Sequence, residues 1–479
     1  MSSASDNQRR VVITGLGLIS PLGSTPAALW SALVAGRSGV ATTSLLPPDQ
    51  QPLRFAAEAR EFMGEIEDFG PLEKEQKKAI KKGLKVMCRE TRMAVAAAQL
   101  ALADAGFADS RSPQQRPDPE MSGVVLGSDY MLTMPEDYEG GMKKCAPDGA
   151  FQFARWGSDG LGEMAPLWML KYLPNMPASH IAIFNDLRGP NNSLTMREAA
   201  GNLAIGEAFR TIQRGHATLM VAGATGTRIL PMQAIHALQT EQMAGTGLSV
   251  AGLSEAGLRE ASYSGDPAKA SRPFDKNRTG MVAGEGAGMV VLEDLESARA
   301  RGATIYAEVV GLGSANVARQ TLSRSLTGGE GPGEGSSSLR GKCDVALARA
   351  MKAALRDAGR SPEDVGHINA HGLSTTESDR DEARAIREVF GTLADMLPVT
   401  APKSYFGNLG AGGGVVELAA SVLALREGRL PRVLNYETPD PECAVSVVQT
   451  DDTPAGRSFL NLSVTPQGQA AVLYIATVD

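Results

Sequence analysis

Short apolar runs alternate with longer helical patterns along the first half of the chain. Each run has the length of a buried strand and ends near a glycine or a polar residue. Strands are predicted at residues 11–17, 123–127, 181–184 and 218–223. Helices are predicted between them, notably at residues 84–105 and 198–214. Because parallel strands need crossover connections, this alternation predicts an α/β fold with a parallel sheet.

The second half of the chain repeats this pattern. Further strands are predicted at residues 305–313, 365–372, 458–462 and 471–475. The helical pattern at residues 416–429 resembles the one at 204–215. This repetition predicts an internal duplication, with one half at residues 10–265 and the other at 266–479, although any two α/β halves look alike. Residues 327–338 are rich in glycine and serine, so we expect a flexible surface loop there.

The composition disfavours several classes of protein. The 479 residues include 47 Lys plus Arg and 54 Asp plus Glu, a net charge of −7, which argues against a nucleic-acid binder. Apolar runs stay shorter than the roughly 18 residues of a membrane span, and residues 1–6 do not start a signal peptide. The four cysteines are far apart, and the five histidines lack metal-ligand spacing with a cysteine. We therefore expect a cytoplasmic protein with free thiols, no metal and no membrane span.

Gly15 and Gly17 follow the first predicted strand and invite comparison with a dinucleotide-binding loop. The third glycine of that motif is missing, because Ser20 stands in its place. Residues 32–40, where the ribose-binding acid would lie, contain no acidic residue. A dinucleotide site is therefore disfavoured.

Three polar residues stand where the predicted elements would build a site. Glu198 lies at the start of a predicted helix, where free backbone amides stabilise anions. On local sequence alone, a first-turn glutamate that merely favours the helix dipole explains it better. His371 ends a predicted strand, and Lys403 opens another strand-turn-helix segment. Ligands of parallel α/β folds bind beyond the carboxyl ends of strands, so these positions together predict a site.

Four segments resemble one enzyme family. Residues 11–23 are similar to its opening strand, and residues 272–288 are similar to its central motif. Asn-Ala-His-Gly at 369–372 and Lys-Ser-x-x-Gly at 403–407 are similar to its two active-site loops. On these motifs, which span nearly the whole chain, the sequence resembles the β-ketoacyl-acyl carrier protein synthases.

The resemblance implies a thiolase-like fold, in which two duplicated α/β halves form five αβαβα layers. It also implies an acyl substrate carried on the phosphopantetheine arm of an acyl carrier protein, with no cofactor of the protein's own. In the family, a cysteine at a helix N-terminus accepts the acyl group. Two histidines polarise the thioester carbonyl during malonyl decarboxylation and condensation.

The family's active site carries over only in part. The matching residues are the first histidine, the lysine and two glutamates, namely His371, Lys403, Glu382 and Glu417. The cysteine position holds Glu198, and the second histidine position holds Asn408. Residues 463–469 replace the loop that supplies part of the family's oxyanion hole and a gating phenylalanine.

These replacements predict the loss of ordinary condensation. Acyl transfer in the family needs a thiolate, whereas a glutamate could only form a mixed anhydride. Asn408 can donate a hydrogen bond but cannot carry a proton, and removing one oxyanion donor alone costs about 10²–10³ in rate. Arg197 and the helix terminus would hold Glu198 ionised, as a plug of the former site; the alternative is an acid or base that acts on a different acyl substrate.

The family contains a precedent for such a protein. Its chain-length factors lack the cysteine and pair with an active synthase, so we expect a non-condensing, acyl-binding subunit of fatty-acid or polyketide biosynthesis. The alternative is an active 3-oxoacyl-acyl carrier protein synthase or a malonyl decarboxylase with an atypical site. Whether the protein is an enzyme stays open at this point.

Lys74, Lys77 and Lys78 form a basic run in an acidic chain. Similar synthases present cations to the acidic acyl carrier protein in this segment, and complementary charge would steer that encounter. The alternative is a solvated helix face. The resemblance further implies a homodimer, or a heterodimer with a cysteine-bearing synthase.

Overall fold

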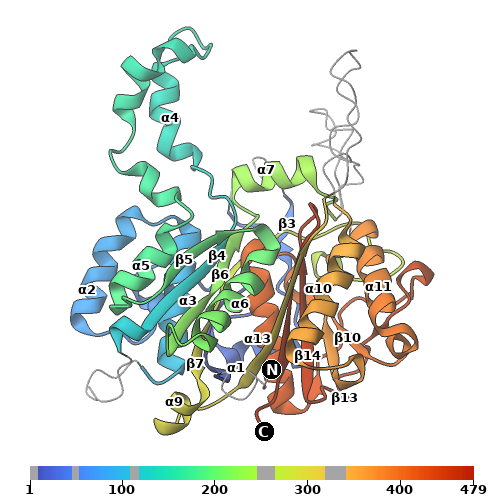
Figure 1. The fold of residues 1–479 in the computed structure, drawn as a ribbon. Coiled ribbons are helices and arrows are strands. Elements are labelled where there is room, and N and C mark those ends of the chain that lie inside the picture. Colours follow the sequence, from blue (N-terminus) through green and yellow to red (C-terminus); the bar gives the residue numbers. More distant parts are fainter. Residues whose placement is uncertain (1–8, 46–52, 108–117, 245–264, 319–340) are drawn as a thin grey trace.

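The protein is described by a computed structural model over residues 9–45, 53–107, 118–244, 265–318 and 341–479. The loop expected at residues 327–338 lies outside this range. An 11-stranded sheet runs through the described part, in the order β12-β10-β9-β14-β15-β8-β1-β7-β6-β4-β5. Helices cover its outer faces, and further helices lie between its two parts (Figure 1).

The sheet consists of two units with the same internal order. The strands of the first unit are β1 (Val11–Ile19), β4 (Ser122–Ser128), β5 (Asn191–Thr195), β6 (Leu219–Thr227) and β7 (Glu285–Asp294). Those of the second are β8 (Ala307–Asn316), β9 (His367–Asn369), β10 (Pro398–Thr400), β14 (Ser458–Val464) and β15 (Gln469–Ala476). In both, the third strand of the five lies farthest from the junction and the second, fourth, fifth and first follow inward; the eleventh strand, the two-residue β12 (Ser446–Val447), pairs with the outer side of β10. This shared order is what an internal duplication predicts, and β1 joins β8 where the units meet.

The pairing of β7 bears on where the halves divide. β7 follows the expected boundary between residues 265 and 266, yet it pairs with β6 and β1 of the first unit. On this ground we propose that the first half extends through β7.

The sheet is mixed, which corrects the expectation of a purely parallel one. β4, β5 and β6 are parallel, and so are β9, β10 and β14, but β7 and β15 run antiparallel to their neighbours. In the second unit, β15 is antiparallel because a short turn joins it to β14, and strands joined by so short a turn can pair only in the antiparallel direction.

Helices form three layers around the two sheet units. On one outer face lie α3 (Arg89–Asp104) and α5 (Met176–Asn185), and on the other lie α10 (Cys343–Ala358) and α11 (Thr376–Phe390). Between the units lie α6 (Ala200–Gln213), which contacts β6 and β15, and α13 (Gly413–Glu427), which contacts β7 and β14. Every residue of α13 from Gly413 to Leu425 is buried. The result is the αβαβα layering predicted from the resemblance.

The remaining elements connect and cap these layers. They are α1 (Pro26–Val34), β2 (Ala41–Thr42), β3 (Phe55–Ala56), α2 (Lys74–Gly83), α4 (Pro135–Lys144), α7 (Pro231–Thr240), α9 (Leu295–Ala300), α12 (Lys403–Phe406), β11 (Arg429–Leu430), β12 (Ser446–Val447) and β13 (Thr453–Pro454).

The glycine pair of the first strand has a packing role. A Cβ added to Gly17 would lie 1.9 Å from the carbonyl oxygen of Ala97, and one added to Gly15 would lie 2.3 Å from that of Ala101. Both carbonyls belong to α3, so the glycines allow this helix to lie directly on β1.

One predicted strand is wrong. Residues 181–184 belong to helix α5, with Pro177 in its first turn. Ile181 is buried and Ile183 is 71% exposed, although a strand would place both on one face. The predicted helix at residues 84–105 instead begins at Arg89, after a 3₁₀ turn at Leu84–Val86. The other predicted strands are confirmed, although the one predicted at residues 365–372 is reduced to the three residues of β9, and all four cysteines are free and buried.

Candidate active site

Glu198 lies in a 3₁₀ turn, Arg197–Ala199, that leads directly into α6. Arg197 has a φ of 51°, a left-handed conformation that costs a non-glycine residue roughly 1–2 kcal/mol. This turn directs the Glu198 side chain into the space between the two halves, where 4% of its surface is exposed. A strained residue beside a buried acid is typical of a functional position.

Three side chains surround the Glu198 carboxylate. Its Oε1 accepts hydrogen bonds from Arg228 Nη2 and, at 3.2 Å, from Asn408 Nδ2, while Arg197 Nε lies 3.4 Å from Oε2. Burial alone would raise the pKa of Glu198, but the charges of Arg197 and Arg228 hold it well below its usual range. The carboxylate is therefore ionised at neutral pH.

The two arginines also lie close to two further carboxylates, those of Asp129 and Glu241. Arg228 lies 3.6 Å from Asp129 and 3.8 Å from Glu241, and Arg197 Nη2 is 2.5 Å from Glu241. Three acids thus share two guanidinium groups in a buried cluster. Sequence reasoning did not find Arg228, Asp129 or Glu241. Arg228 could have been noticed as a lone cation directly after the buried strand β6.

His371 lies in the loop that follows β9. Lys403 Nζ is 3.4 Å from His371 Nδ1 and 2.6 Å from Glu417 Oε1. Burial, reinforced by the charge of Lys403, lowers the pKa of His371 well below its usual value, so its imidazole is neutral. Burial raises the pKa of Glu417 in spite of the nearby lysine.

Glu382 acts on the backbone of the histidine loop. Its two oxygens accept hydrogen bonds from the amides of His371, at 2.6 Å, and Gly372, at 2.8 Å. Burial raises the pKa of Glu382 to about 7, against the effect of these bonds. Asp379 on the same helix binds the amides of Phe274 and Ser374, and burial raises its pKa to about 6. Both acids on α11 hold loops in place.

The structure brings the six candidate residues together from both halves of the chain. They are Glu198, His371, Glu382, Lys403, Asn408 and Glu417, and all are buried. Asn408 links two loops, because its Oδ1 accepts from the Gly410 amide while its Nδ2 reaches Glu198. The chemical roles of these residues stay predictions.

Residues 463–469 end β14 and begin β15. The turn between these strands is closed by bonds from the Thr465 amide to the Gln469 carbonyl and from the Gly468 amide to the Thr465 carbonyl, both 2.9 Å. Ser463 accepts a hydrogen bond from Asn202 Nδ2 at 3.1 Å. This segment is a tight hairpin next to the start of α6.

Lys74, Lys77 and Lys78 lie apart from this cluster, on the outer helix α2 (Figure 1). All three are exposed, and Lys77 Nζ is 3.5 Å from Glu67. Among the described residues, no group of three or more His, Cys, Asp or Glu is arranged to hold a metal ion. None of the helices in the described ranges is long and apolar enough to span a membrane.

Known proteins resemble this chain along both halves. Residues 8–298 match the Beta-ketoacyl synthase N-terminal domain, and residues 330–437 match the Beta-ketoacyl synthase C-terminal domain. A 3-oxoacyl-acyl-carrier-protein synthase 2 of Synechocystis sp. is 34% identical over 92% of this chain and 91% of its own length. The enzyme of that name from Coxiella burnetii is 35% identical over 94% of this chain and 96% of its own.

Solved structures agree with this relationship. An ishigamide ketosynthase/chain length factor has a TM-score of 0.73 at 26% identity and covers 98% of this chain and 100% of its own. A type II polyketide synthase ketosynthase, solved in complex with its acyl-carrier protein, has a TM-score of 0.75 at 24% identity over the same shares of the two chains and confirms the thiolase-like fold. Since the matches span both five-stranded units and the site between them, the chain belongs to the β-ketoacyl synthase family.

Proposed function

We propose that this protein is a non-condensing, chain-length-factor-like subunit of fatty-acid or polyketide biosynthesis. One observation carries the proposal: the Glu198 carboxylate is buried, ionised and bound by Arg228 and Asn408. By resemblance, Glu198 stands where the family's synthases have their cysteine. A carboxylate bound by arginine is a poor nucleophile. Because three acids share only two guanidinium groups here, the cluster should also repel the malonyl carboxylate that condensation requires.

Two further features support the loss of condensation. Asn408 stands where relatives have the second histidine, and its amide is already engaged with Glu198 and Gly410. In addition, the tight β14–β15 hairpin stands where relatives have an oxyanion-hole and gating loop. Nucleophile, proton carrier and oxyanion donor would all be changed at once.

A second candidate is a malonyl decarboxylase. The neutral imidazole of His371 favours it, because Glu382 fixes the loop of this histidine and Lys403 adjoins its Nδ1. Such an imidazole can polarise a thioester carbonyl without a covalent intermediate. Under this function, turnover would need His371 but no acyl group would become attached to the protein.

Incubation with malonyl and acyl carrier proteins tests the proposal. We expect neither carbon dioxide release nor a 3-oxoacyl product from the protein alone, and no labelled acyl group bound to it. Glu198→Gln should behave like the parent protein, as should the control Glu207→Gln on the same helix α6. Condensed product or a covalent acyl adduct would refute the proposal. Carbon dioxide release that disappears in His371→Ala would establish the second candidate.

The partners are part of this proposal. The solved ketosynthase/chain length factor supports a heterodimer with a cysteine-bearing synthase, and the ketosynthase in complex with a carrier protein supports docking of an acyl carrier protein. We place that docking on the exposed lysines of α2. Reversal of the charge at Lys74, Lys77 and Lys78 should weaken carrier-protein binding, with a salt dependence that the variant loses.

A further inference from the structure

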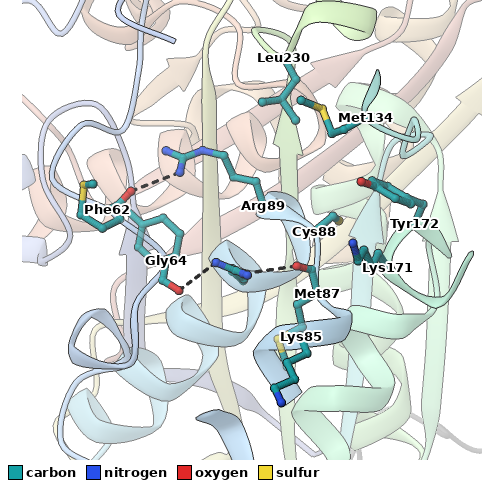
Figure 2. A pocket seen from close by; sticks show the side chains of 12 residues that line it. Phe62, Gly64, Lys85, Met87, Cys88, Arg89, Met134, Lys171, Tyr172 and Leu230 are labelled. Atoms are coloured by element: carbon teal, nitrogen blue, oxygen red, sulfur yellow. Dashed lines mark hydrogen bonds between the residues drawn. The ribbon is translucent and has the colours of Figure 1, made fainter. Parts of the chain in front are cut away.

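A pocket lies on the outer side of the first half, around the start of α3 (Figure 2). Its volume is about 260 Å³. Phe62 and Gly64 line one side, Lys171 and Tyr172 line the opposite side, and Arg89 projects between them (Figure 2). The lining residues include none of the side chains that contact Glu198, so the pocket is separate from the site already described.

Cations line this pocket, and carboxylates do not. Arg89 forms two bonds of 2.6 Å with Glu285, and Lys171 forms one of 2.7 Å with Asp137, so these two charges are compensated. Arg92 donates only to backbone carbonyls, namely those of Met87, Gly64 and Leu84. Three of its five N–H groups are thereby used, and its charge has no carboxylate partner in the described part of the chain.

Lys85 is the second uncompensated cation. It lies in the 3₁₀ turn Leu84–Val86 at the rim of the pocket, exposed and without an ion pair to any described residue. The lining thus contains two positive charges without a described carboxylate partner and no acid of its own. An anionic group at this rim would gain attraction from both.

Part of the pocket's lining, called its floor below, is apolar. Phe62, Met87 and Leu230 are buried there, and the half-buried Met134 of the loop before α4 adds to it. At about 30 Å³ per water-sized group, the volume holds on the order of eight or nine non-hydrogen groups. This size suits a short chain and is below the roughly 300–1,000 Å³ of most small-molecule sites.

We propose that this pocket binds a small amphipathic carboxylate, with the carboxylate at Lys85 and Arg92 and a chain of about six carbons on the apolar floor. The two ends of such a ligand match the two ends of the pocket. Binding here needs no chemistry at Glu198, so the inference is independent of the proposed function.

Titration of the full-length protein with 6,6,6-trifluorohexanoate, followed by ¹⁹F NMR, tests this site. We expect saturable binding that is about tenfold weaker in Lys85→Glu, because reversal of one exposed charge converts an attraction into a repulsion. Met63→Glu, at a rim residue that is 70% exposed, should weaken binding similarly. Lys81→Glu on α2 makes the same change of net charge outside the pocket and should leave the affinity within twofold.

Three results would overturn the assignment. The first is an absence of saturable binding. The second is equal affinity in Lys85→Glu and Lys81→Glu, which would show that the cation at the rim is irrelevant. The third is equal affinity for 6,6,6-trifluorohexanol, which would show that the apolar floor alone selects the ligand.

Discussion

Arg228 is expected to stabilise the protein strongly, and Arg228→Met tests this. The substitution keeps much of the side-chain volume but removes the cation that binds Glu198 and adjoins Asp129 and Glu241. Three buried or nearly buried acids would then share only Arg197. Breaking a buried ion pair by removal of one partner costs about 3–5 kcal/mol, so we expect a loss of this size in the free energy of unfolding at pH 8.

The loss should depend on pH with a definite sign. In the parent protein the pKa of Glu198 is depressed, so its contribution to stability is present above its unfolded-state pKa and is lost only as the pH falls through the folded-state value. In Arg228→Met, burial without this arginine raises the pKa of Glu198. Protonation then relieves the buried charge, so the difference between variant and parent should shrink as the pH falls from 8 to 5.

Urea unfolding followed by circular dichroism at several pH values measures this difference. Arg210→Met is the matched control, because Arg210 pairs with Asp357 near the surface and should cost less than about 1 kcal/mol. Arg228→Met combined with Glu198→Leu should recover part of the loss. A cost below about 1 kcal/mol for Arg228→Met, or a difference that grows at low pH, would refute this account of the charge cluster.

Three further outcomes follow from buried groups elsewhere. Burial lowers the pKa of His367 to about 4, so the folded protein should lose stability as the pH falls from about 6.5 to 4, and His367→Gln should flatten the urea midpoint over that range. Gly17→Ala should lower the free energy of unfolding by about 3 kcal/mol or more, because the added Cβ would clash with α3. Gly162→Ala is the control, since no atom lies within 4 Å of its added Cβ, and it should change that free energy by less than about 0.5 kcal/mol in the same assay. Glu417→Leu leaves the Lys403 ammonium buried without its carboxylate and should cost about 3–5 kcal/mol by urea unfolding; a neutral result would contradict the ion pair.

The sequence predicts an α/β fold because its strands are strongly apolar and alternate with helical patterns, whereas the five layers were predicted only from the resemblance to the synthases. It fails at residues 181–184, where four apolar residues fit a buried strand and a helix equally well. The burial of Ile181 beside the exposure of Ile183 decides for the helix, and this contrast depends on tertiary packing that a short run does not encode. The antiparallel direction of β7 is likewise a property of the sheet and not of its local pattern.

The candidate site was likewise predictable from the sequence only in part. Motif resemblance places Glu198, His371 and Lys403 in one site, because each motif also marks an element of the fold. Arg228 carries no such motif and is 30 positions from Glu198 in sequence. Its contact with Glu198 exists only because β6 ends beside the start of α6. Sequence reasoning therefore found Arg197, one of the two cations that keep Glu198 ionised, and missed the other, Arg228.

The complete burial of α13 has a consequence for synthesis of the protein. Its thirteen residues from Gly413 to Leu425 are buried between the two sheet units and beside α6, which contacts both units as well. While the second half is still being synthesised, nothing packs against the inner side of the first half. The nascent chain therefore exposes a large hydrophobic surface until its last strands have left the ribosome. We therefore expect that neither half folds stably alone. A chain truncated after β7 should aggregate and bind chaperones.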